Sequence, residues 1–312
     1  MSQTELRWAI LELEAEFLMG ISSKALLEAF YRDRRLRNLT DKTLDCYSER
    51  LAFLVDKFAG KEITEITKHD IIGYISGIIG KVSPATVNGR IRVFRLFFRW
   101  LADQGIIEDD PTKKVRLIKE DIAIKPVLTV DQIRRLCDLF ERHRFEGVRN
   151  RTMFLTLFDS GSRVSEIIRL AIEDARLDER ILIIQKSKSR KFRAAPITTE
   201  VARDINSYLI KWRNPIPGCL LFPATDGTKL REDSVYHILE RHGKRHGLKV
   251  YPHMFRRSAA TEYMNAGAPL SVVQSFLGHA DPRTTMQYIQ YDSHRLTRQH
   301  DIYSPLTQPK KK

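Results

Sequence analysis

Apolar residues recur at spacings of three and four over most of the first 112 residues, which is the pattern of amphipathic helices. In the clearest segment Tyr47, Leu51 and Leu54 follow this spacing. Ser83 followed by Pro84 has the form of an N-cap with proline at the first helical position. Helices are therefore predicted over Ser22–Arg35, Leu39–Phe58, Lys68–Ile79 and Ser83 to about Asp103.

The pattern changes in the second half of the chain. The run Arg180–Gln185 contains four consecutive aliphatic residues, and the polar residues 186–191 separate it from a second short run, Phe192–Ile197. This arrangement predicts a β-hairpin inside a mostly helical domain. Residues 113–126 are polar and mixed in charge with little periodicity, which indicates a linker.

The predicted fold class is therefore mainly α with a small β-sheet, in two domains. A chain of 312 residues is also longer than one core usually organises. The predicted division is an N-terminal helical extension (1–21), a first domain (22–112), a linker (113–126) and a second domain with a C-terminal tail (127–312).

Composition narrows the class of protein. No run of about 18 apolar residues could span a bilayer, and the acidic first 20 residues do not resemble a signal peptide, so we expect no membrane association and a cytoplasmic location. The cysteines Cys46, Cys137 and Cys219 lie far apart and include no CxxC. They indicate neither a disulfide framework nor a zinc site, and we expect them to pack as small apolar residues.

The charge indicates a polyanionic partner. The net charge is +14, and Lys and Arg outnumber Asp and Glu by 21 to 19 in residues 1–125 but by 32 to 20 in residues 126–312. Charge alone does not choose between DNA, RNA and a membrane. On the predicted helix from Ser83, Arg92, Arg95 and Arg99 share one stripe that could follow a phosphate backbone, although an ordinary solvated face has the same pattern.

Two segments offer cationic groups for a phosphate. Gly161-Ser-Arg163 leads from a turn into a helix, where free backbone N–H groups and the forked guanidinium of Arg163 both favour an anion. At the hairpin tip, Lys188 could donate a proton to a departing alkoxide, with Lys186 and Lys191 as rivals. Lys191 and Arg193 of the same basic loop are candidate DNA contacts.

A second helix carries two more candidates, His253 and Arg256, which are three residues apart and therefore on one face. Gly278 is predicted to stop the next helix immediately before His279, which could then reach into a cleft. No carboxylate or cysteine accompanies the two histidines at ligand spacing, so no metal site is predicted; core or capping histidines are the more ordinary alternative.

The last candidate is Tyr288, on a helix predicted to restart at Asp281-Pro282. A tyrosine oxygen, with a pKa of about 10, needs a cationic site to become a nucleophile. Tyr291 lies one turn further along the same face, and spacing alone does not separate the two.

Taken in order, these segments resemble the tyrosine recombinases, or phage integrases, with the Xer recombinases as the nearest general pattern. Gly161-Ser-Arg163-Val-Ser-Glu166 resembles the first arginine box, His253-Met-Phe-Arg256 the HxxR box, and Leu277-Gly-His279 with Tyr288 the tyrosine segment. Lys188 resembles the hairpin lysine. The N-terminal helices resemble the core-binding domain of the family, and the second domain resembles its mixed α/β catalytic domain.

The resemblance implies a mechanism. Arg163, Arg256 and His279 would bind the scissile phosphate, Tyr288 would attack it to give a 3′-phosphotyrosyl bond, and Lys188 would protonate the leaving 5′-oxygen. His253 would assist proton transfer at the tyrosine, and Glu166 would orient the catalytic residues without contacting the phosphate itself. Neither ATP nor a divalent metal would be required, so no cofactor is expected.

The resemblance also implies partners. The two domains would clamp double-stranded DNA, and a homo- or hetero-tetramer would act on two sites, with accessory proteins as further candidate partners. The tail after Tyr288 would dock on a neighbouring protomer or be a disordered end. The rival classes are a type IB topoisomerase, which would relax supercoils without pairing two sites, and a DNA-binding regulator without a nucleophile.

Overall fold

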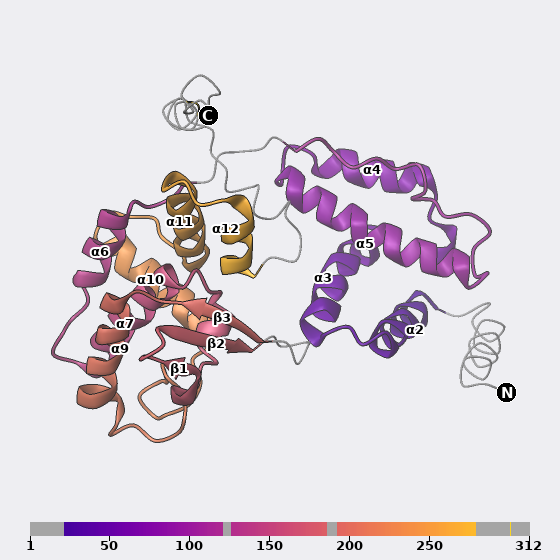
Figure 1. Ribbon diagram of the computed structural model, residues 1–312. Coiled ribbons are helices and arrows are strands. Elements are labelled where there is room, and N and C mark those ends of the chain that lie inside the picture. Colours follow the sequence, from indigo (N-terminus) through magenta and orange to yellow (C-terminus); the bar gives the residue numbers. More distant parts are fainter. Residues whose placement is uncertain (1–21, 121–125, 186–191, 279–299, 301–312) are drawn as a thin grey trace, which may run out of the picture. The chain divides into compact units, whose positions relative to one another are not determined.

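The computed structural model describes residues 22–120, 126–185, 192–278 and 300 (Figure 1). The chain divides into two compact units, Met1–Ala123 and Ile124–Lys312. Each unit has its own hydrophobic core. Among the described residues, no helix combines the length and the apolar character that crossing a membrane needs.

Four α-helices and one 3₁₀ turn build the described part of the first unit, close to the predicted ranges. At the heart of the core, the Phe30 ring packs edge-on against Phe97 and Trp100, with centroids 5.1 and 5.6 Å apart. This contact joins the first helix to the longest helix in the described part of the unit. The elements are α2 (Ser23–Leu36), α3 (Asp41–Lys57), η1 (Ile63–Glu65), α4 (Lys68–Ile78) and α5 (Pro84–Asp103).

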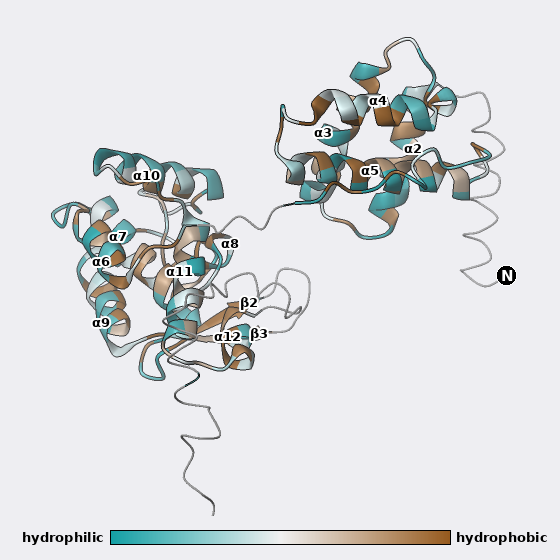
Figure 2. Cartoon of the chain, turned by 90° about the horizontal axis from the view of Figure 1, so that it is seen from above, coloured by the Kyte–Doolittle hydropathy of each residue, from teal (hydrophilic) through white to brown (hydrophobic). Residues whose placement is uncertain are grey.

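Helix α5 begins as its sequence predicts. The Ser83 hydroxyl accepts a hydrogen bond from the Thr86 N–H at 3.2 Å, and Pro84 occupies the first helical position, where a missing N–H costs nothing. Its apolar residues are buried on one side, and α5 is brown along much of its length in Figure 2, the colour of hydrophobic residues. The predicted helix is confirmed.

The start of the predicted linker over 113–126 is bound to α5 through residues 115–118. The side chain of Asn88, which is buried, donates to the Ile118 carbonyl at 2.9 Å and accepts from the Ile118 N–H at 2.8 Å. Arg95 donates to the Val115 carbonyl, and the Val115 side chain joins the core. Polar contacts hold this segment, so hydrophobic periodicity gave no sign of it.

The second unit contains both helices and a small β-sheet. Its predicted hairpin is confirmed as β2 and β3, and a two-residue strand that the sequence analysis missed completes an antiparallel sheet in the order β1-β2-β3. The elements are α6 (Val130–Asp138), α7 (Phe145–Asp159), α8 (Val164–Ile167), η2 (Ile172–Asp174), β1 (Ala175–Arg176), β2 (Ile181–Gln185), β3 (Phe192–Pro196), α9 (Thr199–Tyr208), η3 (Leu209–Arg213), α10 (Glu232–Arg245), α11 (Pro252–Asn265) and α12 (Leu270–Leu277).

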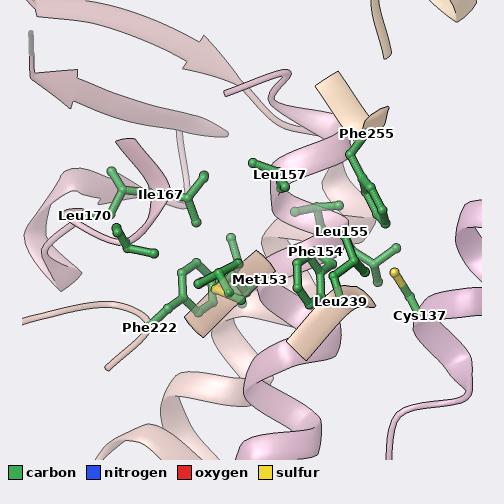
Figure 3. Close-up of a cluster of buried hydrophobic side chains, with 14 of the residues drawn as sticks. Cys137, Met153, Phe154, Leu155, Leu157, Ile167, Leu170, Phe222, Leu239 and Phe255 are labelled. Atoms are coloured by element: carbon green, nitrogen blue, oxygen red, sulfur yellow. The ribbon is translucent and has the colours of Figure 1, made fainter. Parts of the chain in front are cut away.

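Helix α7 runs through the core of this unit. Its Met153, Phe154 and Leu157 are buried together with Ile167 from α8 and Phe255 from α11 (Figure 3). Helix α7 thus packs against both α8 and α11. It therefore fixes α8 and α11, the two helices that carry candidate site residues.

The register of the hairpin determines which face of the sheet carries Arg193 of β3. Ile184 pairs with Arg193 and Leu182 pairs with Ala195, so these four side chains share one face of the sheet. Leu182, Ile184 and Ala195 are fully buried on that face. Arg193 is thus the charged residue on an otherwise apolar inner face.

The cysteines only partly follow expectation. Cys137 is buried in the core near α7, whereas Cys46 is half-buried and Cys219 is exposed. The prediction that all three pack as small apolar residues is therefore wrong for Cys219, which lies in the loop before Leu221 and reaches solvent.

Candidate active site

The turn between α7 and α8 brings Arg163 to the start of a helix, as predicted. Gly161 has a φ of +56°, and the buried Ser162 follows it. Arg163 then caps α8, with its own N–H donating to a Glu166 carboxylate oxygen at 2.9 Å. Hydrogen bonds within the protein thus hold the turn.

Gly161 allows this turn for two reasons. A left-handed φ is costly for residues with a Cβ, and a Cβ here would lie 2.5 Å from Cε1 of Phe276 on α12. The glycine therefore lets the turn and α12 approach each other.

Replacing Gly161 by alanine is expected to lower the free energy of unfolding by about 2 kcal/mol or more, from backbone strain and overpacking together. Urea unfolding measures the change. Gly247→Ala is the matched control, because Gly247 has a φ of +70° but a Cβ at that position would meet no atom within 4 Å. Equal losses in the two variants would show that the contact with Phe276 does not matter.

The Arg163 side chain is tethered and yet accessible. Its Nη1 donates to Glu166 Oε1 at 3.0 Å, and 41% of the side chain remains exposed. A guanidinium has five N–H donors, so a pairing of this kind orients the group without exhausting it. Arg163 can thus meet an anion that approaches from solvent.

Arg256 approaches the same turn from α11. It is only 3% exposed, and it donates to the Gly161 carbonyl and, at 2.6 Å, to the Leu277 carbonyl. These acceptors lie in the Arg163 turn and at the end of α12. A buried cation bound to carbonyls in this way joins three elements at one point and brings positive charge beneath the turn.

His253 is an exposed residue in the otherwise buried first turn of α11, three residues before Arg256 and therefore on the same face of the helix. Partial desolvation, followed by the positive charges of Arg256 and Arg163, lowers the pKa of His253 below its ordinary value of 6.5. The imidazole is therefore kept neutral near neutral pH and can both donate and accept a hydrogen bond.

We expect the NMR titration of the His253 ring to have its midpoint below pH 6.5. Because the unfolded chain binds this proton more readily than the folded one, His253 makes the protein less stable as the pH falls through about 6.5. Arg163→Ala should raise the midpoint toward 6.5. Arg169→Ala, which removes an exposed charge six residues further along the chain, should not. A midpoint at or above 6.5 in the unaltered protein would contradict this account.

Arg193 lies differently from what the sequence analysis expected. Predicted as a DNA contact, it is only 9% exposed and donates to Glu166 Oε2 at 2.7 Å, to the Ser162 hydroxyl at 3.2 Å and to the Phe276 carbonyl at 3.0 Å. Its guanidinium is directed into the protein, which corrects the prediction. Strand alternation was the available signal, because it puts Arg193 on the same face as the buried Ala195.

Glu166 joins the two arginines. Burial alone would raise the pKa of its carboxyl group, but Arg193, the Arg163 N–H and the Arg163 charge outweigh burial and hold the pKa below its usual range. The carboxylate is thus ionised at neutral pH and divides its hydrogen bonds between two cations. The structure brings Arg163, Glu166, Arg193 and Arg256 together.

Several predicted site residues lie outside the described residues. They are Lys188 and its rivals Lys186 and Lys191, then His279, Tyr288 and Tyr291. The approach to His279 is described, however: α12 ends at Gly278 in the left-handed conformation, as the sequence predicts.

In the first unit, the arginine stripe of α5 is only partly free to contact a ligand. Arg92 and Arg99 are exposed, and Arg92 lies 3.9 Å from Glu120. Arg95 is half-buried, with its guanidinium directed to the Val115 carbonyl. Arg92 and Arg99 therefore remain the stronger candidates for a phosphate contact, and Arg95 also fastens the following segment.

Within the residues that the structure describes, no three or more His, Cys, Asp and Glu side chains are grouped so that they could hold a metal ion. The chemistry available around the Arg163 turn is that of an anion site. The guanidinium groups of Arg163 and Arg256 and the neutral imidazole of His253 supply hydrogen-bond donors, and the Glu166 carboxylate orients Arg163.

Comparison with known proteins agrees with this geometry. The model of the phage integrase family matches residues 126–295, and that of the phage integrase N-terminal SAM-like domain matches residues 26–108. The chain belongs to the phage integrase family. It is a tyrosine recombinase, an enzyme that breaks and rejoins DNA strands in site-specific recombination.

Relatives of this recombinase match over nearly their whole length. The tyrosine recombinase XerD of Ralstonia nicotianae is 28% identical over 86% of this chain and 89% of its own. The tyrosine recombinase XerC of Thermodesulfovibrio yellowstonii is 30% identical over 80% and 86%. A solved structure of the Tn1549 transposon integrase with transposon right end DNA has a TM-score of 0.77 at 18% identity, over 91% of this chain and 99% of that one, which shows the common fold.

Proposed function

We propose that this recombinase cleaves DNA with Tyr288 as the nucleophile and with Arg163 and Arg256 as the phosphate-binding pair. The observation that supports the proposal most is the bond from Arg256 to the Gly161 carbonyl, two residues before Arg163. It gathers two cations from distant parts of the sequence at one turn. A phosphodiester that gains charge in its transition state needs such preorganised cations.

The other groups would complete the reaction. Arg163, Arg256 and His279 hold the non-bridging oxygens, and Tyr288 attacks the phosphorus to form a 3′-phosphotyrosyl bond. Lys188 gives a proton to the leaving 5′-oxygen, and neutral His253 assists proton transfer at the tyrosine. The covalent link retains the phosphoester energy, so strand rejoining by a 5′-hydroxyl needs neither ATP nor a divalent metal.

Binding to double-stranded DNA would involve both units. The Tn1549 integrase relative was solved in complex with DNA, and the exposed Arg92 and Arg99 of α5 offer this chain cations for a phosphate backbone. We propose that Lys191 adds a further contact from the hairpin. Four protomers, identical or of two kinds, would then pair two sites and exchange strands.

A nicked suicide substrate tests the proposal. Since the nicked fragment diffuses away after cleavage, rejoining fails and a covalent protein–DNA adduct should accumulate in EDTA and without ATP. The same preparation should recombine a plasmid that carries two target sites. An adduct with supercoil relaxation but no two-site product, whether or not a second kind of protomer is added, would indicate a topoisomerase. Binding without an adduct would indicate a regulator, and either result contradicts the proposal.

A further inference from the structure

Arg193 links three parts of the candidate site. From the second position of β3 it contacts the Arg163 turn through Ser162, α8 through Glu166 and the end of α12 through the Phe276 carbonyl. Each contact is made by the guanidinium of a side chain that is only 9% exposed. Burying a cation is costly unless its hydrogen bonds are well made, and three acceptors from three elements meet that need.

The first consequence concerns Arg163. Glu166 Oε1 accepts a hydrogen bond from the Arg163 side chain, whereas Oε2 accepts from both the Arg163 N–H and Arg193. Arg193 thus compensates part of the carboxylate charge and fixes the direction of the carboxylate plane. Without it, Glu166 could turn toward Arg163 and neutralise the cation that the proposed function assigns to the phosphate.

The second consequence concerns the end of α12. Arg193 donates to the Phe276 carbonyl and Arg256 to the Leu277 carbonyl, so two cations satisfy consecutive carbonyls at the negative end of this helix. Gly278 follows with a φ of +66°, and a Cβ there would lie 2.6 Å from the Arg193 Cδ. The chain leaves α12 directly against Arg193, one residue before His279.

We propose that Arg193 is a positioning residue of the recombinase, which aims Arg163 through Glu166 and fixes the end of α12 from which His279 follows. This inference rests on the proposed function, because it concerns the same phosphate site. It replaces the expectation that Arg193 contacts DNA: the residue acts on DNA cleavage through other side chains.

The test separates cleavage from binding. In Arg193→Gln, single-turnover cleavage of the nicked suicide substrate at saturating DNA should slow by about 10-fold to 100-fold, the range expected for loss of a group that orients others. The dissociation constant for DNA should stay within about twofold. Arg176→Gln, which removes an exposed arginine from β1 of the same sheet, is the matched control and should cleave at the normal rate.

A pH profile distinguishes positioning from a merely structural role. Because Arg193 helps to keep Glu166 ionised, Arg193→Gln should raise the Glu166 pKa, and the acid limb of the cleavage rate should move to higher pH. The shift should vanish when Glu166 is already Gln. If Arg193→Gln does not fold, Arg193→Lys serves, since it keeps a charge near Glu166 but cannot bond to all three elements.

Each result decides a different question. Weaker DNA binding with normal cleavage at saturation would identify Arg193 as a DNA contact and overturn the inference, as would an unchanged rate and pH profile. Absence of an adduct from the unaltered protein would instead contradict the proposed function itself.

Discussion

Replacing Tyr288 by phenylalanine is expected to abolish the covalent protein–DNA adduct, the largest effect that any single change in this chain should have. The phenolic oxygen is the atom that would bond to phosphorus, and phenylalanine keeps the ring but lacks that atom. On a nicked suicide substrate, adduct should fall below detection while DNA binding in a gel-shift assay stays within about twofold.

Tyr291→Phe is the matched control. It makes the same chemical change one helical turn away in the predicted helix, so it should leave adduct formation intact. If adduct persisted in Tyr288→Phe and disappeared in Tyr291→Phe, the nucleophile would be Tyr291. If both variants formed adduct, the assignment of Tyr288 as the required nucleophile would be wrong.

The parts of the fold that the sequence predicted well are those with a local cause. Ser83 and Pro84 determine where α5 begins, and Gly278 determines where α12 ends, because each acts on backbone conformation within its own turn. The hairpin followed from aliphatic strands on either side of a polar tip. Family motifs then identified Arg163 and Arg256 as one site, although they lie far apart in the sequence.

The parts that the sequence did not predict depend on contacts between distant polar groups. The bonds between Asn88 and Ile118 fasten a segment that looked like a linker, and no periodic pattern encodes them. Arg193 lies in a basic run that suggested a DNA contact, but the strand register directs its side chain toward Glu166. Such pairings become visible only when the tertiary structure brings both partners together.

Replacing Arg256 by alanine is expected to slow cleavage at saturating DNA by about 100-fold to 1,000-fold, the usual cost of losing one preorganised donor to a transition-state charge. The variant should also unfold more easily, by about 1–3 kcal/mol, because the Gly161 and Leu277 carbonyls lose a buried donor. Urea unfolding and single-turnover cleavage measure the two effects separately.

Arg257→Ala separates the effect on cleavage from the effect on stability. Arg257 is the next residue of α11 and is also buried, but its Nη2 donates to the Tyr251 hydroxyl at 2.6 Å rather than to the Arg163 turn. This variant should lose comparable stability while it cleaves DNA at close to the normal rate. Arg256→Lys should recover only part of the rate, because an ammonium group keeps the charge but cannot reproduce the planar fork. A folded Arg256→Ala protein that cleaved as fast as the unaltered enzyme would leave Arg256 with a purely structural role, and the phosphate would then have to be held by Arg163 without it.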